Sequence, residues 1–206
     1  MKIEMLAFGQ YAANCYVVYD ETTKDAIIID PGSGGDEIGK WVQENGLKVK
    51  LIVLTHNHPD HIGALGEVKE ATGANVAIHA DDAAVLQRGL RFGPMSSSTH
   101  PIPAPDLLIK DGDSLDAGSL HFLVIHTPGH TRGGICLLTD AVLFSGDTLF
   151  NSSVGRSDMP GGNGVQLIQG IFAKLMTLPD ETVVLPGHGP ETTIGRERRS
   201  NPFLRG

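Results

Sequence analysis

The residues with the clearest potential for chemistry lie in the segment His56-Asn57-His58-Pro59-Asp60-His61, which holds three imidazoles and one carboxylate. Imidazole nitrogens and carboxylate oxygens are common ligands of divalent metal ions. His56 and His58 are two positions apart in a predicted loop and can point the same way. Asp60 and His61 open a predicted helix and can face a neighbouring ion. Because this pattern rarely arises by chance, it predicts a metal centre.

Three further candidate ligands each follow a predicted apolar strand and a turn that contains glycine: His130 after residues 120–125, Asp147 after residues 141–144, and His188 after residues 182–185. The His56 segment likewise follows the fully apolar residues 51–54, a pattern typical of a strand buried on both faces. In open α/β sheets, ligands bind at the edge formed by the carboxyl ends of the strands. Because glycine allows sharp turns there, we expect all these side chains to meet at that edge.

The segments between these residues predict alternating strands and helices. The predicted strands span residues 3–8, 15–19, 26–29, 51–54, 76–79, 120–125, 134–138, 141–144 and 182–185, and the predicted helices span residues 35–45, 62–72, 81–88, 164–176 and 193–199. Residues 89–106 contain four prolines and a run of three serines, so they predict a long irregular loop that covers the site. This order predicts an α/β layered sandwich in which residues 1–206 form a single domain.

Composition limits the classes of partner. The 206 residues include 16 Lys and Arg against 24 Asp and Glu, and the formal charge of -8 disfavours nucleic-acid binding because it repels a phosphate backbone. No run approaches the ~18 apolar residues of a membrane span, and the amino terminus lacks the apolar stretch of a signal peptide. We therefore expect a cytoplasmic protein that does not bind membranes. Cys15 and Cys136 lie in apolar runs and are predicted to be buried free thiols.

These motifs resemble the metallo-β-lactamase superfamily, and within it the glyoxalase II-like hydrolases. The resemblance extends from about Asn14 to about Leu204. Its landmarks are Asp30-Pro31-Gly32, His56 to His61, Thr127-Pro128-Gly129-His130-Thr131, Gly146-Asp147-Thr148-Leu149-Phe150, Gly155-Arg156-Ser157-Asp158 and Pro186-Gly187-His188-Gly189-Pro190. The resemblance implies the four-layer αββα sandwich of that family, with a two-metal site at one edge.

The resemblance also implies how the ligands divide between two ions. It places the first ion on His56, His58 and His130, the second ion on Asp60, His61 and His188, and Asp147 as a bridge between both. Such ligands suit two Zn²⁺ ions per chain, with iron or manganese as alternatives. A site with open positions lowers the pKa of bound water to about 7, so a metal-held hydroxide is the expected nucleophile. Asp60 is the candidate catalytic residue that orients it.

The expected substrate is a small thioester, with S-lactoylglutathione as the candidate. A thiolate leaving group, with a parent pKa of about 8.5, departs without a proton, so a site with no evident general acid favours a thioester. Longer glyoxalase II enzymes carry a helical carboxyl-terminal region that helps to hold glutathione, and we expect a short form that lacks it. Arg156 is a candidate for binding a substrate carboxylate, with an internal ion pair to Asp158 as the alternative.

The residues alone leave other functions open. The same centre would suit a lactone or another ester, and a related persulfide dioxygenase would hold one iron on His56, His130 and Asp147. β-Lactam hydrolysis is disfavoured by the lack of an export signal. A metal-binding scaffold without catalysis is disfavoured by the open metal positions, and an RNA-binding nuclease component by the negative charge. The histidines outside the motifs are expected to have local structural partners: His79, His100, His121 and His126. The oligomeric state is left open.

Overall fold

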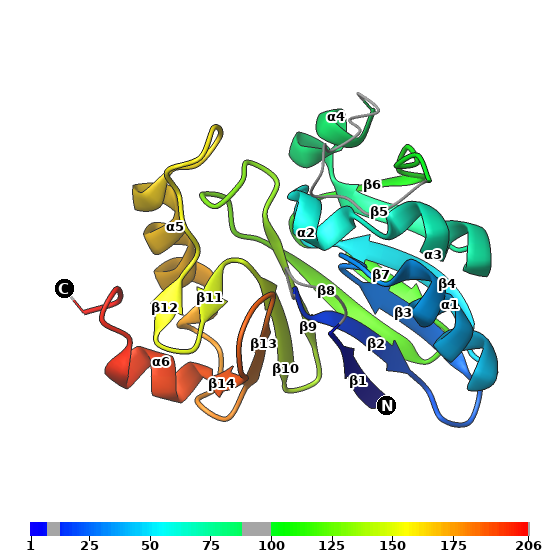
Figure 1. Cartoon of the computed structure of the whole chain (residues 1–206). Helices are drawn as coiled ribbons and strands as arrows, with labels where there is room; N and C mark the ends of the chain where they lie inside the picture. The colour runs from blue at the N-terminus through cyan, green and yellow to red at the C-terminus, as the bar shows by residue number, and fades with distance from the viewer. Residues whose placement is uncertain (8–12, 88–99, 206) are drawn as a thin grey trace.

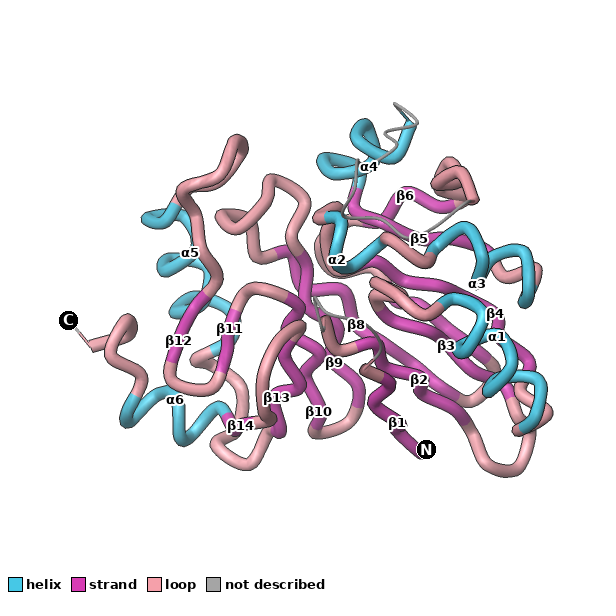
Figure 2. Tube along the Cα trace, in the orientation of Figure 1, coloured by secondary structure: helices cyan, strands magenta, loops and turns pink. Residues whose placement is uncertain are grey.

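A computed structural model describes residues 1–7, 13–87 and 100–205. In this part of the chain, two six-stranded sheets lie face to face and helices cover the outer face of each (Figure 1). The layers therefore follow the order helix, sheet, sheet, helix. Figure 2 shows how strands and helices alternate along the chain. The α/β sandwich expected from the sequence is confirmed.

The first sheet has the strand order β1-β2-β3-β4-β5-β6. Its strands are β1 (Lys2–Leu6), β2 (Cys15–Tyr19), β3 (Asp25–Ile29), β4 (Lys48–Leu54), β5 (Asn75–His79) and β6 (Leu107–Ile109). Strands β1, β2 and β3 pair antiparallel, whereas β3 to β6 pair in parallel. The four parallel strands therefore direct their carboxyl ends to the same edge.

The second sheet has the strand order β14-β13-β10-β9-β8-β7. Its strands are β7 (Ser114–Ala117), β8 (Leu120–His126), β9 (Ile135–Thr139), β10 (Val142–Gly146), β13 (Val183–Pro186) and β14 (Thr192–Thr193). A separate hairpin of β11 (Leu149–Phe150) and β12 (Ser153–Val154) follows β10. Strand β9 is antiparallel to both β8 and β10, and β10 is parallel to β13. Strands β8, β10 and β13 therefore end at one edge.

The helices lie outside the two sheets (Figure 1). On the side of the first sheet are α1 (Gly35–Glu44), α2 (Pro59–Ile62), α3 (Leu65–Thr72) and α4 (Ala80–Gln87), and on the side of the second are α5 (Gly164–Gly170), a π-helical turn (Ile171–Leu175) and α6 (Ile194–Ser200). Among the residues that the structure describes, no helix combines the length and the apolar character that a membrane span needs.

Strand periodicity distributes the apolar side chains among separate cores. In β4, Ile52 and Leu54 enter the core between the first sheet and its helices, whereas Leu51 and Val53 enter the core between the two sheets. A third core, which includes Leu167, lies between the second sheet and its helices. Because successive strand residues point to opposite faces, a strand covered on both sides needs a continuous apolar run. Each buried aliphatic side chain contributes roughly 1.5–3 kcal/mol to stability.

The helix predicted over residues 62–72 is divided in the structure, so that prediction was wrong at its start. The short α2 begins at Pro59, a residue that suits the first helical position, and α3 begins only at Leu65. Gly63 lies against backbone between the two, because a Cβ atom there would come within 2.5 Å of the Gly32 carbonyl oxygen. Gly63 keeps helical dihedral angles, whereas Ala64 leaves them and its N–H donates a 3.0 Å hydrogen bond to the carbonyl oxygen of Pro31.

Other differences from the predicted elements are local. The helix predicted over residues 164–176 changes to a π-helical turn after Gly170. Strands β6, β7, β11, β12 and β14 are absent from the sequence-based prediction because runs this short show no period. Most of the covering loop predicted over residues 89–106 lies outside the described residues. Cys15 and Cys136 are buried and free, as predicted.

Candidate metal centre

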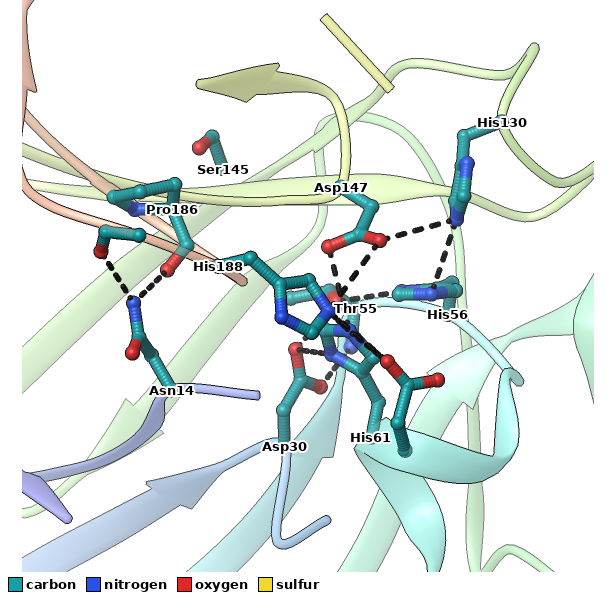
Figure 3. Close-up of polar contacts among 12 residues, drawn as sticks. Asn14, Asp30, Thr55, His56, His61, His130, Ser145, Asp147, Pro186 and His188 are labelled. Carbon is teal, nitrogen blue, oxygen red and sulfur yellow. Dashed lines mark hydrogen bonds and ion pairs between the residues drawn. The ribbon is translucent and has the colours of Figure 1, made fainter. Parts of the chain in front are cut away.

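The candidate ligands lie where strands of both sheets end at one edge of the sandwich (Figure 3). The first sheet supplies the segment after β4, and the second sheet supplies the turns after β8, β10 and β13. The structure brings together the seven side chains named from the sequence: His56, His58, Asp60, His61, His130, Asp147 and His188. They form two groups of three with one carboxylate between them.

The first group consists of His56, His58 and His130, with one ligand atom of each within 4.8 Å of the others. The Nε2 atoms of His56 and His130 are 3.3 Å apart. Two nitrogens bound at about 2.0–2.1 Å to one tetrahedral zinc ion lie roughly 3.3 Å from each other. These imidazoles therefore have the spacing of ligands that share an ion.

The second group consists of Asp60, His61 and His188, again with one ligand atom of each within 4.8 Å of the others. The Nε2 atoms of His61 and His188 are 3.3 Å apart, and Oδ2 of Asp60 is 2.9 Å from Nε2 of His188. The His188 side chain is 38% exposed, whereas that of His61 is fully buried. This group therefore opens to solvent on the side of His188.

Asp147 lies between the two groups (Figure 3). Its Oδ1 is 3.3 Å from Nε2 of His61, and its Oδ2 is 3.4 Å from Nε2 of His130. The side chain is 11% exposed, and its buried Oδ1 has no hydrogen-bond partner within the described part of the chain. A buried carboxylate oxygen without a partner is costly, and a cation beside it would remove that cost. Oδ2 also lies 3.9 Å from Nε2 of His188, so the carboxylate reaches both groups and the residues present fit two metal ions.

Asp30, directly after β3, supports one histidine in each group. Its Oδ2 lies 2.9 Å from Nδ1 of His61, and its Oδ1 accepts a 2.7 Å hydrogen bond from the N–H of Thr55. The Thr55 hydroxyl donates to Asp30 and lies 3.1 Å from Nδ1 of His56. These contacts engage the Nδ1 atoms of both rings, so that the Nε2 atoms face the centre. Asp30 has a φ of 53°, a left-handed conformation that is uncommon outside glycine.

The turn that carries His130 is fixed by two other groups. Nδ1 of His130 donates a 2.7 Å hydrogen bond to the carbonyl oxygen of Arg156. The carboxylate of Asp82, in the first turn of α4, accepts hydrogen bonds from the Thr131 hydroxyl at 2.7 Å and from the Gly133 N–H at 2.8 Å. Asp82 is buried, and this burial raises the pKa of its carboxyl group. Asp82 therefore ties a helix of the first sheet to a ligand turn of the second.

Gly187, next to His188, makes room for the side chains between the two groups. A Cβ atom at this position would lie 2.3 Å from Oδ1 of Asp147 and 2.6 Å from Cε1 of His61. Both distances are shorter than any real contact of a methyl group. The close packing of the candidate ligands therefore requires glycine here.

Electrostatics keep two imidazoles of the first group, those of His56 and His58, neutral. Burial and the neighbouring imidazoles lower the pKa of His56 well below its ordinary value. Burial is also the main cause that lowers the pKa of His58 to about 4. Both imidazoles are therefore unprotonated at neutral pH, which is the form that binds a metal ion.

The second group attracts positive charge. Burial alone would lower the pKa of His61, but the carboxylates of Asp30 and Asp147 outweigh it and raise this pKa well above its ordinary value. Burial alone would raise the pKa of Asp60, but the contact with His188 and the charge of His61 lower it to about 2. The neighbouring histidines also lower the pKa of Asp147, so the ionised carboxylates of Asp60 and Asp147 favour a cation beside this group.

Comparison with known proteins identifies the family. A family profile described as the metallo-beta-lactamase superfamily matches residues 8–188. The chain belongs to this superfamily. Hydroxyacylglutathione hydrolase GloC of Haemophilus influenzae is 35% identical over 212 residues, which cover 99% of this chain and 98% of that protein. The probable metallo-hydrolase YqgX of Bacillus subtilis is 39% identical over 214 residues, which cover 100% of this chain and 99% of that protein.

Solved structures share the metallo-β-lactamase fold over nearly the whole chain. The B3 metallo-beta-lactamase BLEG-1 has a TM-score of 0.89 at 37% identity, with 100% of both chains covered. ETHE1 from Myxococcus xanthus has a TM-score of 0.83 at 33% identity, with 98% of this chain and 84% of that chain covered. TTHA1623, solved in a di-iron-bound form, has a TM-score of 0.81 at 37% identity and coverages of 98% and 100%. A protein of this fold can therefore hold two iron ions.

Arg156 forms the internal ion pair that the sequence left as an alternative. Its Nε and Nη2 atoms lie 2.9 Å and 2.8 Å from the two carboxylate oxygens of Asp158. Both side chains are exposed, so the pair is accessible to a competing anion. Binding of a substrate carboxylate by Arg156 stays a prediction.

The histidines outside the centre have local partners, as expected. His79 and His126 stack, with 3.9 Å between ring centroids and 13° between ring planes. His100 and His121 each lie beside neighbouring carboxylates. Asp81 brings a carboxylate close to the stacked pair. These three residues have one ligand atom each within 4.8 Å of one another, and Nε2 of His126 also lies 2.9 Å from the carbonyl oxygen of Arg132.

Proposed function

We propose that this chain is a binuclear metallohydrolase that cleaves a small thioester, with S-lactoylglutathione as the first substrate to test. The proposed Zn²⁺ ligands are His56, His58 and His130 for the first ion, Asp60, His61 and His188 for the second, and Asp147 for both. The observation that carries the proposal is the position of Asp147, because its carboxylate lies within 4 Å of His130 of the first group and of His61 and His188 of the second. Similarity to GloC over nearly the whole chain supports a thioester as the substrate.

Two ions held in this cluster would polarise the substrate carbonyl and lower the pKa of water to about 7. Asp60 supplies the positioning of the attacking water. Its side chain is 32% exposed, and its low pKa keeps it ionised, so it accepts a hydrogen bond from water that enters on the solvent side. A thiolate departs without a proton, so the reaction needs no side-chain acid.

Arg156 is the proposed contact for a carboxylate of the substrate. Its backbone carbonyl already holds His130, so the side chain begins beside the first group. A substrate carboxylate would replace Asp158 in the same two-point contact with the guanidinium. Arg156→Gln should therefore raise KM with little change in kcat, whereas an unchanged KM would remove this role.

The proposed activity is tested by steady-state hydrolysis of S-lactoylglutathione with zinc-loaded protein, followed as the loss of thioester absorbance. We expect turnover by the wild type and its loss in Asp60→Ala. The matched control is Asp116→Ala, which removes an exposed carboxylate that pairs with His121 and should keep full turnover. No turnover by wild type that holds two ions would reject the thioester. Lactones, other esters and β-lactams would then be tested with the same sample.

A mononuclear iron oxygenase is the second candidate, because three of the residues could form a site on their own. His56 and His130 are 3.3 Å apart at Nε2, and Asp147 lies 3.4 Å from His130. Two histidines and one carboxylate are the ligands of a facial-triad iron site. One iron per chain, with oxygen uptake on a persulfide, would favour this candidate over the hydrolase.

A further inference from the structure

The turn that carries His188 is held by the other sheet. Asn14 directly precedes β2 of the first sheet, and its backbone N–H donates a 2.7 Å hydrogen bond to the carbonyl oxygen of Gly187. Its side-chain Nδ2 donates to the carbonyl oxygens of Pro186 at 3.0 Å and Gly189 at 2.9 Å. Figure 3 shows Asn14 reaching Pro186 beside His188. The accepting carbonyls lie on both sides of His188 in the sequence.

Tyr16 adds a second donor to the same turn. Its hydroxyl donates to the carbonyl oxygen of Pro186 at 2.7 Å and lies 3.2 Å from Nδ2 of Asn14. The Tyr16 ring packs edge-on against Phe144, with 5.2 Å between centroids. Asn14 and Tyr16 are only 6% and 3% exposed. A buried amide with carbonyl partners for both of its N–H groups has no remaining donor and one preferred orientation.

This arrangement acts on one of the two groups of ligands. His188 belongs to the second sheet, whereas its partners Asp60 and His61 follow β4 of the first sheet. Because Asn14 directly precedes β2, its hydrogen bonds tie the His188 turn to the sheet that carries those partners. His130 of the first group is oriented by different atoms, namely the carbonyl oxygen of Arg156.

We propose that Asn14 is a positioning residue for the second metal ion, the one assigned to Asp60, His61 and His188. Without its amide, the exposed His188 would no longer be held at the spacing that an ion needs. Loss of an outer hydrogen-bond partner typically lowers metal affinity by about 10–100-fold. The inference rests on the two-ion centre of the proposed function but not on the identity of the substrate, so metal binding tests it directly.

The test measures Zn²⁺ affinity of the full chain by competition with a chromophoric chelator. Asn14→Ala should lower the affinity for the second ion by about 10–100-fold and leave the affinity for the first ion unchanged. Tyr16→Phe, which removes one donor and keeps the ring, should lower the affinity for the same ion by a smaller factor. The matched control is Asn201→Ala, because the fully buried Asn201 also donates twice, to Ser153 and Glu197, but away from the ligand turns. This control should leave both affinities unchanged.

A double-mutant cycle shows whether Asn14 acts through His188. In a His188→Ala background, Asn14→Ala should cause no further loss of affinity, whereas in a His130→Ala background its effect should persist. The proposal would be overturned if Asn14→Ala lowered the affinity for both ions equally. It would also be overturned if the effects of Asn14→Ala and His188→Ala on affinity added in full. Thermal unfolding of the metal-free variants shows whether each one folds. If Asn14→Ala does not fold, the affinity of Tyr16→Phe is compared with that of wild type instead. A wild type that binds one ion would reject the two-ion centre itself.

Discussion

His130 and His188 are the imidazoles that turns of the second sheet supply, one to each group of ligands. Because they belong to different groups, their replacement should separate the two ions. We predict that His130→Ala removes the first ion, whereas His188→Ala weakens the second ion more than the first. Metal content per chain after dialysis measures both effects. Identical metal loss in the two variants would mean that the ions bind as one cooperative cluster.

Asp82 should make stability depend on pH. Burial raises its pKa in the folded protein above the ordinary 3.8, so the folded state holds this proton more tightly than the unfolded chain does. The stability that this raised pKa contributes is complete below the unfolded pKa and is lost as pH rises through the folded pKa. We predict that, as the pH rises from about 4 to about 6, the free energy of unfolding of wild type falls relative to that of the Asp82→Asn variant. Urea unfolding across this range checks the prediction, and a constant difference would contradict it.

The candidate ligands were recognisable from the sequence because their types are dense and local. Histidines and an aspartate within one short segment, and glycine turns before His130 and His188, need no long-range information. Asp30 is different: its motif is a landmark of the family resemblance, but its contacts with Thr55 and His61 depend on how β3 pairs with β4. Asn14 likewise depends on the two sheets meeting. The spacing of residues along the chain does not reveal such contacts.

Secondary-structure elements could be predicted where burial imposes a period. The apolar run at residues 51–54 marked β4 because both faces of this strand are covered. The break between α2 and α3 was not predicted, since the N–H of Ala64 donates to the carbonyl oxygen of Pro31, a residue distant in sequence. The short strands of the β11–β12 hairpin have too few residues to show any pattern. Tertiary contacts decide such elements.

Helix α6 holds the β11–β12 hairpin through one buried carboxylate. Glu197 accepts hydrogen bonds from the Thr192 hydroxyl, the Ser152 N–H and the Asn201 side chain, and it is fully buried. We predict that Glu197→Ala lowers the free energy of unfolding by roughly 2–4 kcal/mol, because it leaves buried donors without an acceptor. Chemical denaturation measures this change. The exposed Arg196→Ala should stay within about 0.5 kcal/mol of wild type, and an equally small effect of Glu197→Ala would contradict the prediction.

At the scale of the whole molecule, the centre joins the two sheets. The first sheet supplies the segment from His56 to His61, and the second supplies His130, Asp147 and His188. Ions that bind these residues only in the folded state should therefore stabilise the sandwich, by about 4 kcal/mol at a thousandfold excess over Kd. For a chain of this size, we predict that chelation lowers Tm by roughly 10 °C. Calorimetry with and without chelator measures it, and an unchanged Tm would show that the ions do not link the sheets.

The fold class could be predicted at this scale, whereas the packing of the sheets could not be derived from pattern alone. Alternating strands and helices indicate an α/β sandwich, and the four-layer order followed from resemblance to a known family. The two faces of each strand look alike in sequence, since Leu51 and Ile52 are both aliphatic yet enter different cores. Which face meets the other sheet is decided by how the sheets pack.

The dispersal of the ligands along the chain also sets the order in which they become available during translation. The ribosome makes the segment from His56 to His61 well before it makes His130, Asp147 and finally His188. An ion that reaches the nascent chain early can contact at most the four candidate ligands of that first segment. Asp147 and both turns of the second sheet must follow before two ions can share one carboxylate. Completion of the centre therefore waits until the turn that carries His188 has left the ribosome.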